Sequence, residues 1–418
     1  MQQILPPPLP PQAQHSALSR MDDAQRMEFW ASLSLRHAQG LGLRSCKRLL
    51  DYFGSAREAV SKTRVWAAAR VHEDKAGLFA GSSWRLHAQK EWAGACGLDA
   101  DILLWQDPKY PQRLKELPDA PPLLYCQGDM RLLQAPCVAV VGSRHCSQEG
   151  IAVARDIAGQ LSACGITVVS GLAMGIDSQA HLAALGHAGS TVAVLGTGID
   201  VIYPKGNAKL FAQIASDGLI LTEFAPSAPP DASHFPIRNR LISGLSFGVL
   251  IVEATRRSGS LITARLALEQ NREVYAIPGS VFAECSAGCQ DIIRQGARAV
   301  FSAEDILRDL APQLRNYGSH TSMPNVMEPA RQNASRQRAT HPAAGIASPL
   351  EISPAAPETP DGDFGRIVRA LRAQGPCHVD ELARQVELPV ARLSAFLVQL
   401  ELQALVLRLP GMRYKASG

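Results

Sequence analysis

The sequence predicts an α/β protein with a doubly wound sheet of the Rossmann kind, preceded by a small helical domain and followed by a winged-helix domain. Two observations predict the sheet. From Cys137 to Leu310, short β-branched runs alternate with amphipathic stretches, which is the pattern of βαβ units with right-handed crossovers. Glycine-containing turns, at Gly142, Gly171 and Gly259, stand where strands give way to helices.

Length, composition and charge are those of a folded multidomain protein. The chain has 418 residues, which is enough for two to four domains, and 46% of them are hydrophobic. A net charge of +4 is too small to establish nucleic-acid binding, so any basic surface must be local. The 9 cysteines are scattered without paired C-x-x-C motifs, which predicts no metal site and fits a reducing cytosol. Neither a signal peptide nor a membrane-length apolar run is apparent, so we expect a cytoplasmic protein without a membrane partner.

The N-terminal part divides into a tail and a helical domain. Residues 1–22 are rich in proline and glutamine, and we expect them to be disordered. Residues 23–100 follow a helical pattern, with the turn Gly40-Leu41-Gly42 placed between two predicted helices. Such a hairpin can bind a nucleic-acid backbone through its N–H groups, or it can serve only for packing and contacts.

Residues 101–311 are expected to hold the sheet. Strand-like runs near Leu103 and at 123–126 lead into a βαβ unit: a buried strand at Cys137–Val141, a helix that ends at Gly165, and a strand at 166–169. The later strands are predicted at 191–195, 219–222, 247–252, 273–277 and 299–301, with helices at 178–188, 207–216, 261–271, 290–295 and 303–310.

The C-terminal part predicts a linker and a second folded domain. Residues 312–361 are dominated by proline, alanine, serine and glutamine, which favours a flexible linker. Residues 362–418 contain three helical patterns followed by a hairpin pattern, which together are typical of a winged helix. DNA-binding members insert the third helix into the major groove, but here Arg392 is its only basic residue, so DNA contact and protein contact are both open.

Candidate ligand-binding residues follow the first two strands of the βαβ unit. Ligands of open α/β sheets bind at the carboxyl ends of strands, where helix N-termini attract anions. Gly142, Ser143 and Arg144 form the first such turn, and Ser170 and Gly171 begin the second. Neither turn has a dinucleotide or nucleoside-triphosphate signature, so no cofactor is predicted. Each turn by itself is equally consistent with a tight strand-to-helix connection.

Further candidates follow the later strands. A lysine after the third strand can bind phosphate or lie in solvent, and two arginines around an asparagine can clamp phosphates or pair with carboxylates such as Glu223 and Glu253. Three small residues open another helix. Nearby aromatic side chains could stack on bases, but we expect Tyr203, Phe224 and Phe235 in the core. These candidate ligands are Lys205, Arg238, Asn239, Arg240, Ser258, Gly259 and Ser260.

Six segments resemble, in order, the motifs of the DNA-processing protein A family (DprA, also called Smf). They are VAVVGSR, SGLAMGIDSQAH, TVAVLGTGIDVIYPKGN, FPIRNRLISGLS, VEATRRSGSLITARLALEQNREVYAIPG and DIIRQGA. The resemblance extends over about Trp105 to Leu310, and it implies an extended Rossmann domain flanked by a sterile-alpha-motif-like domain and a winged helix. It also implies a non-enzymatic function: binding and protecting incoming single-stranded DNA, loading the RecA recombinase on it during natural transformation, and homodimerisation through the Rossmann domain.

The resemblance also implies roles for particular residues. Arg144 and Lys205 are the DNA contacts that the motifs imply. The pocket would be formed by Gly142, Ser143, Ser170 and Gly171, with Arg238 and Arg240 lining or supporting it. Two segments depart from the family pattern. Residues 231–233 lack a basic residue that some relatives carry before HFP, and residues 280–289 match only loosely.

An enzyme on a similar fold is the main alternative. Nucleotide phosphoribohydrolases that resemble lysine decarboxylases carry a P-G-G-x-G-T-x-x-E signature, whose glutamate acts in cleavage of a glycosidic bond. Here Thr263 stands in place of that glutamate, and a hydroxyl group cannot act as a general base at neutral pH. Glu253 and Asp177 remain candidate acids. A scaffold protein that docks through its winged helix is a third possibility.

Overall fold

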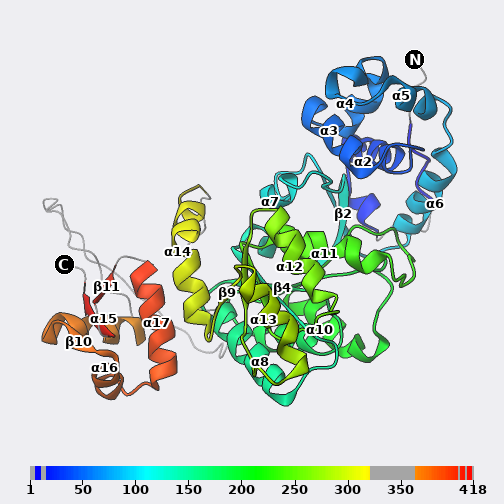
Figure 1. The fold of residues 1–418 in the computed structure, drawn as a ribbon. Coiled ribbons are helices and arrows are strands. Elements are labelled where there is room, and N and C mark those ends of the chain that lie inside the picture. Colours follow the sequence, from blue (N-terminus) through cyan, green and yellow to red (C-terminus); the bar gives the residue numbers. More distant parts are fainter. Residues whose placement is uncertain (1–4, 11–15, 321–362, 403–404, 410–411, 417–418) are drawn as a thin grey trace, which may run out of the picture. The chain divides into compact units, whose positions relative to one another are not determined.

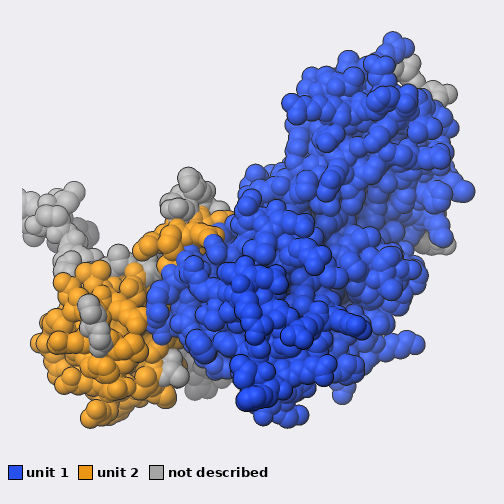
Figure 2. All heavy atoms as spheres, in the orientation of Figure 1, with its two compact units in different colours: residues 1–310 blue, residues 311–418 orange. Residues whose placement is uncertain are grey.

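The computed structural model describes residues 5–10, 16–320, 363–402, 405–409 and 412–416. The chain forms two compact units, Met1–Leu310 and Ala311–Gly418, which Figure 2 draws in different colours. In the first unit, one continuous apolar core extends from the helical segment into the sheet. The helical segment and the sheet therefore support one another within this unit.

Short helices form the N-terminal segment around a cluster of aromatic side chains, with Trp30, Trp66 and Trp84 fully buried. The prediction of a disordered tail over 1–22 is wrong at residues 17–20, because they form a helix whose Leu18 is 0% exposed. Arg20 ties this helix to the start of the sheet by ion pairs with Asp99 and Asp101. The elements are α1 (Ala17–Arg20), α2 (Asp23–Arg36), α3 (Leu43–Phe53), α4 (Ala56–Ser61), η2 (Thr63–Ala69), α5 (Glu73–Ala80) and α6 (Arg85–Cys96).

A nine-stranded sheet follows, in the order β1-β2-β6-β5-β4-β3-β7-β8-β9. Figure 1 labels β2, β4 and β9 of this sheet. The seven strands from β6 to β9 in this order are parallel, whereas β1 and β2 extend the sheet in antiparallel fashion. The strands are β1 (Asp101–Leu104), β2 (Leu123–Gly128), β3 (Cys137–Val141), β4 (Thr167–Ser170), β5 (Thr191–Val194), β6 (Leu219–Thr222), β7 (Gly248–Ile251), β8 (Glu273–Ala276) and β9 (Arg298–Ala299). The predicted doubly wound α/β fold is confirmed.

Helices connect these strands on both faces of the sheet. Right-handed crossovers place α8, α9 and α10 on one face and the packed pair α11 and α12 on the other. The short connections of this unit are α7 (Gln112–Lys115), η3 (Met130–Gln134), η4 (Lys205–Asn207) and η5 (Glu284–Ser286). The longer helices are α8 (Gln148–Ala163), α9 (Ile176–Ala184), α10 (Ala208–Asp217), α11 (His234–Leu245), α12 (Ser260–Glu269), α13 (Ala287–Arg294) and α14 (Ala303–His320).

Helix α11 was not predicted from the sequence. Pro236 interrupts the helical signal, but in the structure it lies in the first turn, where the missing N–H group costs nothing. The polar run from Arg238 to Arg240 also hides the periodicity, since both arginines are buried. This helix carries several of the candidate site residues, so its path decides which of them reach the site.

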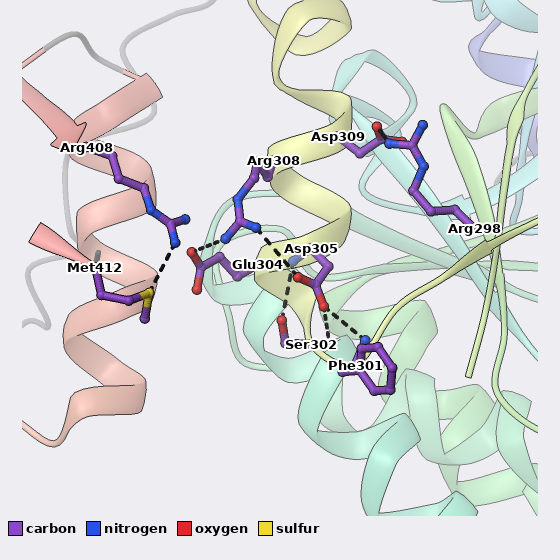
Figure 3. Close-up of polar contacts among 9 residues, drawn as sticks. All are labelled: Arg298, Phe301, Ser302, Glu304, Asp305, Arg308, Asp309, Arg408 and Met412. Carbon is purple, nitrogen blue, oxygen red and sulfur yellow. Dashed lines mark hydrogen bonds and ion pairs between the residues drawn. The ribbon is translucent and has the colours of Figure 1, made fainter. Parts of the chain in front are cut away.

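The predicted linker over 312–361 is wrong at its beginning, because α14 continues through Pro312 to residue 320. Residues 321–361 lie outside the described part of the chain. Figure 3 shows how α14 starts: the Asp305 carboxylate accepts hydrogen bonds from the backbone N–H groups of Phe301 and Ser302, at 3.0 and 3.2 Å. One turn further on, Arg308 donates to Glu304 at 2.6 Å.

The second unit contains the predicted three helices and hairpin. Its sheet has the order β10-β12-β11, and the hairpin of β11 and β12 is antiparallel. Arg392, the basic residue of the third helix, lies 3.5 Å from Asp363 and over the Phe396 ring. None of the described helices has the length and apolarity that crossing a membrane requires. The elements are α15 (Asp363–Gln374), β10 (Cys377–His378), α16 (Val379–Gln385), α17 (Val390–Leu402), β11 (Val406–Leu409) and β12 (Arg413–Ala416).

Candidate nucleic-acid interface

A pocket of about 150 Å³ opens where β3, β4 and β5 end, and we call it the edge pocket. The loops that follow these three strands form its walls, and α11 closes it from the other face of the sheet. Its lining residues are Arg144, His145, Gly171, Ala173, Met174, Leu195, Gly196, Thr197, Tyr203, Pro204, Phe235 and Arg238. This is the edge at which ligands of open α/β sheets bind.

Two arginines make the edge pocket positive. Arg144 is exposed at its rim, whereas Arg238 is 4% exposed and donates from Nη1 to the carbonyl oxygens of Gly171, at 2.7 Å, and Val194. Burial lowers the pKa of the Arg238 guanidinium to about 10; the nearby Arg144 charge acts in the same direction, and Asp177 opposes it. The Arg238 guanidinium is therefore still charged at neutral pH, and its repulsion from the Arg144 charge favours the binding of an anion.

Two aromatic rings lie beside these charges. The Phe235 ring centroid is 5.6 Å from the Arg144 guanidinium and 6.0 Å from that of Arg238. The Tyr203 ring lies 5.5 Å from Phe235 and is 39% exposed. The expectation that Tyr203, Phe224 and Phe235 belong to the core is wrong. Tyr203 and Phe235 line the edge pocket, and Phe224, which stacks on His234, is only half-buried. Residues three apart lie on the same face of a helix. If α11 had been predicted as a helix, the spacing Phe235-x-x-Arg238 would have indicated that these two side chains lie side by side.

Three buried polar groups hold the loop after β4, and of these only Asp177 was a candidate from the sequence, as an acid. Asp177 accepts the N–H group of Gly171 at 3.1 Å, as well as those of Gly142 and Ala173. His181 Nε2 accepts the N–H group of Leu172 at 3.3 Å, while its Nδ1 lies 2.7 Å from Thr191 Oγ1. Asn207 Nδ2 donates to the Leu172 carbonyl at 2.9 Å. Leu172 is thereby kept at a φ of 55°, in the left-handed region. In the sequence, His181 and Asn207 carry no signal beyond belonging to the motifs.

The buried state of His181 predicts a pH-dependent stability. Burial lowers the pKa of His181 from 6.5 to about 3, so the unfolded chain binds a proton in this range and the folded chain does not. The contribution of neutral His181 to the free energy of unfolding is complete above pH 6.5. It is lost as the pH falls towards 3, by up to about 1.4 kcal/mol per pH unit. We expect wild type to have a higher free energy of unfolding than His181→Gln at pH 7. The difference between the two proteins, measured by urea titration, should become smaller at lower pH. A gap that stays constant from pH 7 to 4 would contradict this prediction.

Other predicted residues do not line the edge pocket. Ser170 is fully buried and donates to the Val140 carbonyl at 2.7 Å, so its predicted place in the pocket is wrong. Arg240 points elsewhere and binds Glu223 at 2.5 Å and Asp119 at 3.7 Å, which is the carboxylate pairing left open above. Asn239 acts through Arg238, whose Nε donates to its Oδ1 at 3.1 Å.

The turn after β3 supports the pocket rather than binding an anion through α8. A Cβ on Gly142 would meet Ile176 at 2.7 Å, and the Ser143 hydroxyl donates to the His145 carbonyl at 2.7 Å. The start of α8 is already occupied, because Glu253 accepts from the backbone N–H group of Ser147 at 2.9 Å and from its hydroxyl. The expected anion site at this helix is therefore wrong: a carboxylate of the protein fills it.

The remaining candidates lie at different distances from the edge pocket. Lys205 is exposed and directly follows Pro204, a lining residue, although Lys205 does not itself line the pocket. Ser258 and Gly259 precede α12 and Ser260 begins it, beyond β7 and on the other side of β3. The hydroxyls of Ser258 and Ser260 lie 2.8 Å apart. They do not converge with the edge pocket as predicted. Within the described ranges, no cluster of three or more His, Cys, Asp or Glu residues could hold a metal ion.

Comparison with known proteins agrees with the motifs. The family model of DNA recombination-mediator protein A matches residues 101–311, and that of the DprA winged helix domain matches residues 351–412. Protein Smf of Synechocystis sp. is 38% identical over 74% of this chain and 78% of its own length. DNA processing protein DprA of Streptococcus pneumoniae is 49% identical over 49% of this chain and 72% of its own. The X-ray structure of DprA from Streptococcus pneumoniae superposes with a TM-score of 0.59 at 39% identity, over 66% of this chain and 95% of that one. The chain thus belongs to the DNA recombination-mediator protein A family, the DprA/Smf proteins.

Proposed function

We propose that this protein binds single-stranded DNA at the edge pocket, without sequence preference. One observation carries the proposal: two guanidinium groups flank the accessible Phe235 ring, with Tyr203 beside it. Proteins that bind single strands combine cations for the phosphates with aromatic faces for the unpaired bases. A duplex keeps its bases stacked and cannot offer them to these rings, so the pocket should favour single strands.

The residues in and beside the edge pocket take different roles in this proposal. Arg144 is exposed at the rim, and Lys205 is exposed next to the lining residue Pro204. Both contact phosphates, because each side chain can move to follow a flexible backbone. Arg238 is held by the Gly171 carbonyl, so it contributes a fixed positive charge beneath the strand. Gly171 is needed here because a Cβ at this position would lie 2.6 Å from the Arg238 guanidinium.

The cellular role that we propose is the one the family resemblance implies. Membership of a family described as DNA recombination mediators supports protection of incoming single strands and loading of RecA during natural transformation. Homodimerisation through the Rossmann domain would bring two edge pockets together and raise affinity for one strand by avidity. These events would take place in the cytoplasm, where RecA acts.

The hydrolase alternative finds little support in the geometry. Thr263, in place of the catalytic glutamate, is 1% exposed. Glu253 is occupied at the start of α8, and Asp177 holds three backbone N–H groups while burial raises its pKa. Both candidate acids thus have structural partners, and we propose no catalytic role for either.

A salt series tests the proposal directly. Fluorescence anisotropy with a labelled single strand and the matched duplex should give tighter binding of the single strand. The logarithm of its affinity should fall with log salt concentration by about 0.7 per phosphate contact. Absence of single-strand binding at low salt would overturn the proposal, and cleavage of nucleoside monophosphates would then be assayed to test the hydrolase alternative.

A further inference from the structure

The positive charge of the first unit lies mainly outside its sheet. Residues 16–100 carry 13 lysines and arginines against 9 aspartates and glutamates, whereas residues 101–310 carry 17 against 20. Phosphate contacts dominate the affinity of proteins for DNA and depend on clustered cations. The helical segment is therefore the more favourable part of this unit for an extended polyanion, although the edge pocket is on the sheet.

A groove of about 360 Å³ concentrates part of this charge between α3 and the turn that follows α7. We call it the basic groove, and its lining residues are Arg44, Lys47, Arg48, Asp51, Glu116, Leu117 and Pro118. Its two carboxylates already have partners, because Asp51 pairs with Lys47 and Glu116 lies 2.8 Å from Arg272. Within the described residues, Arg44 and Arg48 have no carboxylate partner, and Arg48 donates only to the Arg70 carbonyl.

The first turn of α3 adds to the positive potential beside the basic groove. It contains Arg44 and no acidic residue, its N-cap is the exposed Gly42 without a side-chain cap, and the Lys75 ammonium donates to Ser45 Oγ at 2.9 Å. By contrast, α2, α4, α5 and α8 each begin with a side-chain cap and an acidic first turn. Cations at the positive end of a helix dipole are unfavourable unless an anion joins them.

The groove differs from the edge pocket in having no aromatic lining. Trp105, which lies beneath Lys47, is 5% exposed, and the neighbouring Tyr110 is 3% exposed. Because none of the residues that line the groove carries a ring on which unpaired bases could stack, recognition there would rest on phosphates. We propose that the basic groove binds DNA through its sugar–phosphate backbone alone, and therefore holds duplex and single-stranded DNA alike. This second site does not depend on the edge pocket.

The test uses the full chain, a labelled duplex and its single strand, and the double variant Arg44→Ala/Arg48→Ala. The matched control, Arg64→Ala/Lys90→Ala, removes two exposed charges of the same helical segment outside the groove. The groove variant should lose at least about tenfold in duplex affinity, the lower end expected for charge-assisted contacts. Its salt slope should fall by about 0.9 for each lost contact, whereas the control should change little.

The outcomes separate this site from the edge pocket. Single-strand affinity should fall less than duplex affinity in the groove variant, because the edge pocket remains. In Arg144→Ala, by contrast, single-strand affinity should fall more than duplex affinity. If the groove variant had the same duplex affinity and salt slope as the control variant, the proposal that the basic groove binds DNA would be overturned. Failure of the wild-type chain to bind duplex at low salt would overturn it as well. If wild type showed no preference for single strands over duplex, the proposed single-strand site at the edge pocket would be overturned. The proposed DNA site at the basic groove would not be affected.

Discussion

Replacing Arg240 with methionine is expected to lower the free energy of unfolding by about 3–5 kcal/mol, which is the cost of leaving one member of a buried ion pair alone. Arg240 Nη2 lies 2.5 Å from Glu223 Oε2, and each of these side chains is 7% exposed. Burial already raises the pKa of Glu223, against the lowering effect of Arg240 and Arg36. We expect a value near the lower limit because Arg36 still offsets the carboxylate charge. Urea denaturation at pH 7 measures the change.

Two further measurements separate the structural role of Arg240 from a role in DNA binding. The double variant Arg240→Met/Glu223→Leu should recover most of the stability, since it replaces the pair by apolar side chains of similar size. Single-strand affinity of the folded Arg240→Met protein should equal that of wild type, because Arg240 does not line the edge pocket. A stable variant that loses DNA binding would reinstate the sequence prediction that Arg240 contacts the strand.

Replacing Arg144 with alanine is expected to weaken single-strand binding by about 1.5–3 kcal/mol, the range for a hydrogen bond to a charged group. Arg144 is exposed and its guanidinium lies over the Phe235 ring, so its loss should leave the unfolding free energy nearly unchanged. Its loss also removes one of the two charges that flank the ring. Anisotropy titrations at one salt concentration measure the effect.

Arg131→Ala is the matched control for this experiment. Arg131 is an exposed arginine of the same sheet segment, pairs with Asp129, and does not line the edge pocket. Arg131→Ala removes the same formal charge as Arg144→Ala, so an effect of net charge on DNA affinity would appear in both variants. Equal affinities for Arg144→Ala and Arg131→Ala would rule out Arg144 as a DNA contact.

Element order could be predicted from the sequence because each strand of a parallel sheet is a short apolar run bounded by turn residues. The strands Cys137–Val141 and Leu219–Thr222 have the predicted bounds. Helix α11 could not be predicted in this way. Its polar residues are buried by partners from distant strands, and burial of that kind leaves no apolar periodicity in the chain.

The position of the anion site depended on contacts between distant segments. Glu253 follows β7, yet its carboxylate fills the start of α8, more than 100 residues earlier in the chain. No local pattern indicates such a contact. The same holds for His181 and Asn207, which are ordinary helix and loop residues until the fold brings them against the backbone of Leu172.

The sequence by itself determined the family, the order of strands and helices, and the exposed cations Arg144 and Lys205, since these follow from motifs and local patterns. Tertiary structure alone decided which of Arg238 and Arg240 faces the edge pocket. Two residues apart on a helix, they lie on nearly opposite sides, about 200° around its axis. One therefore joins the aromatic rings at the strand ends, and the other is directed to Glu223 on the far side of α11.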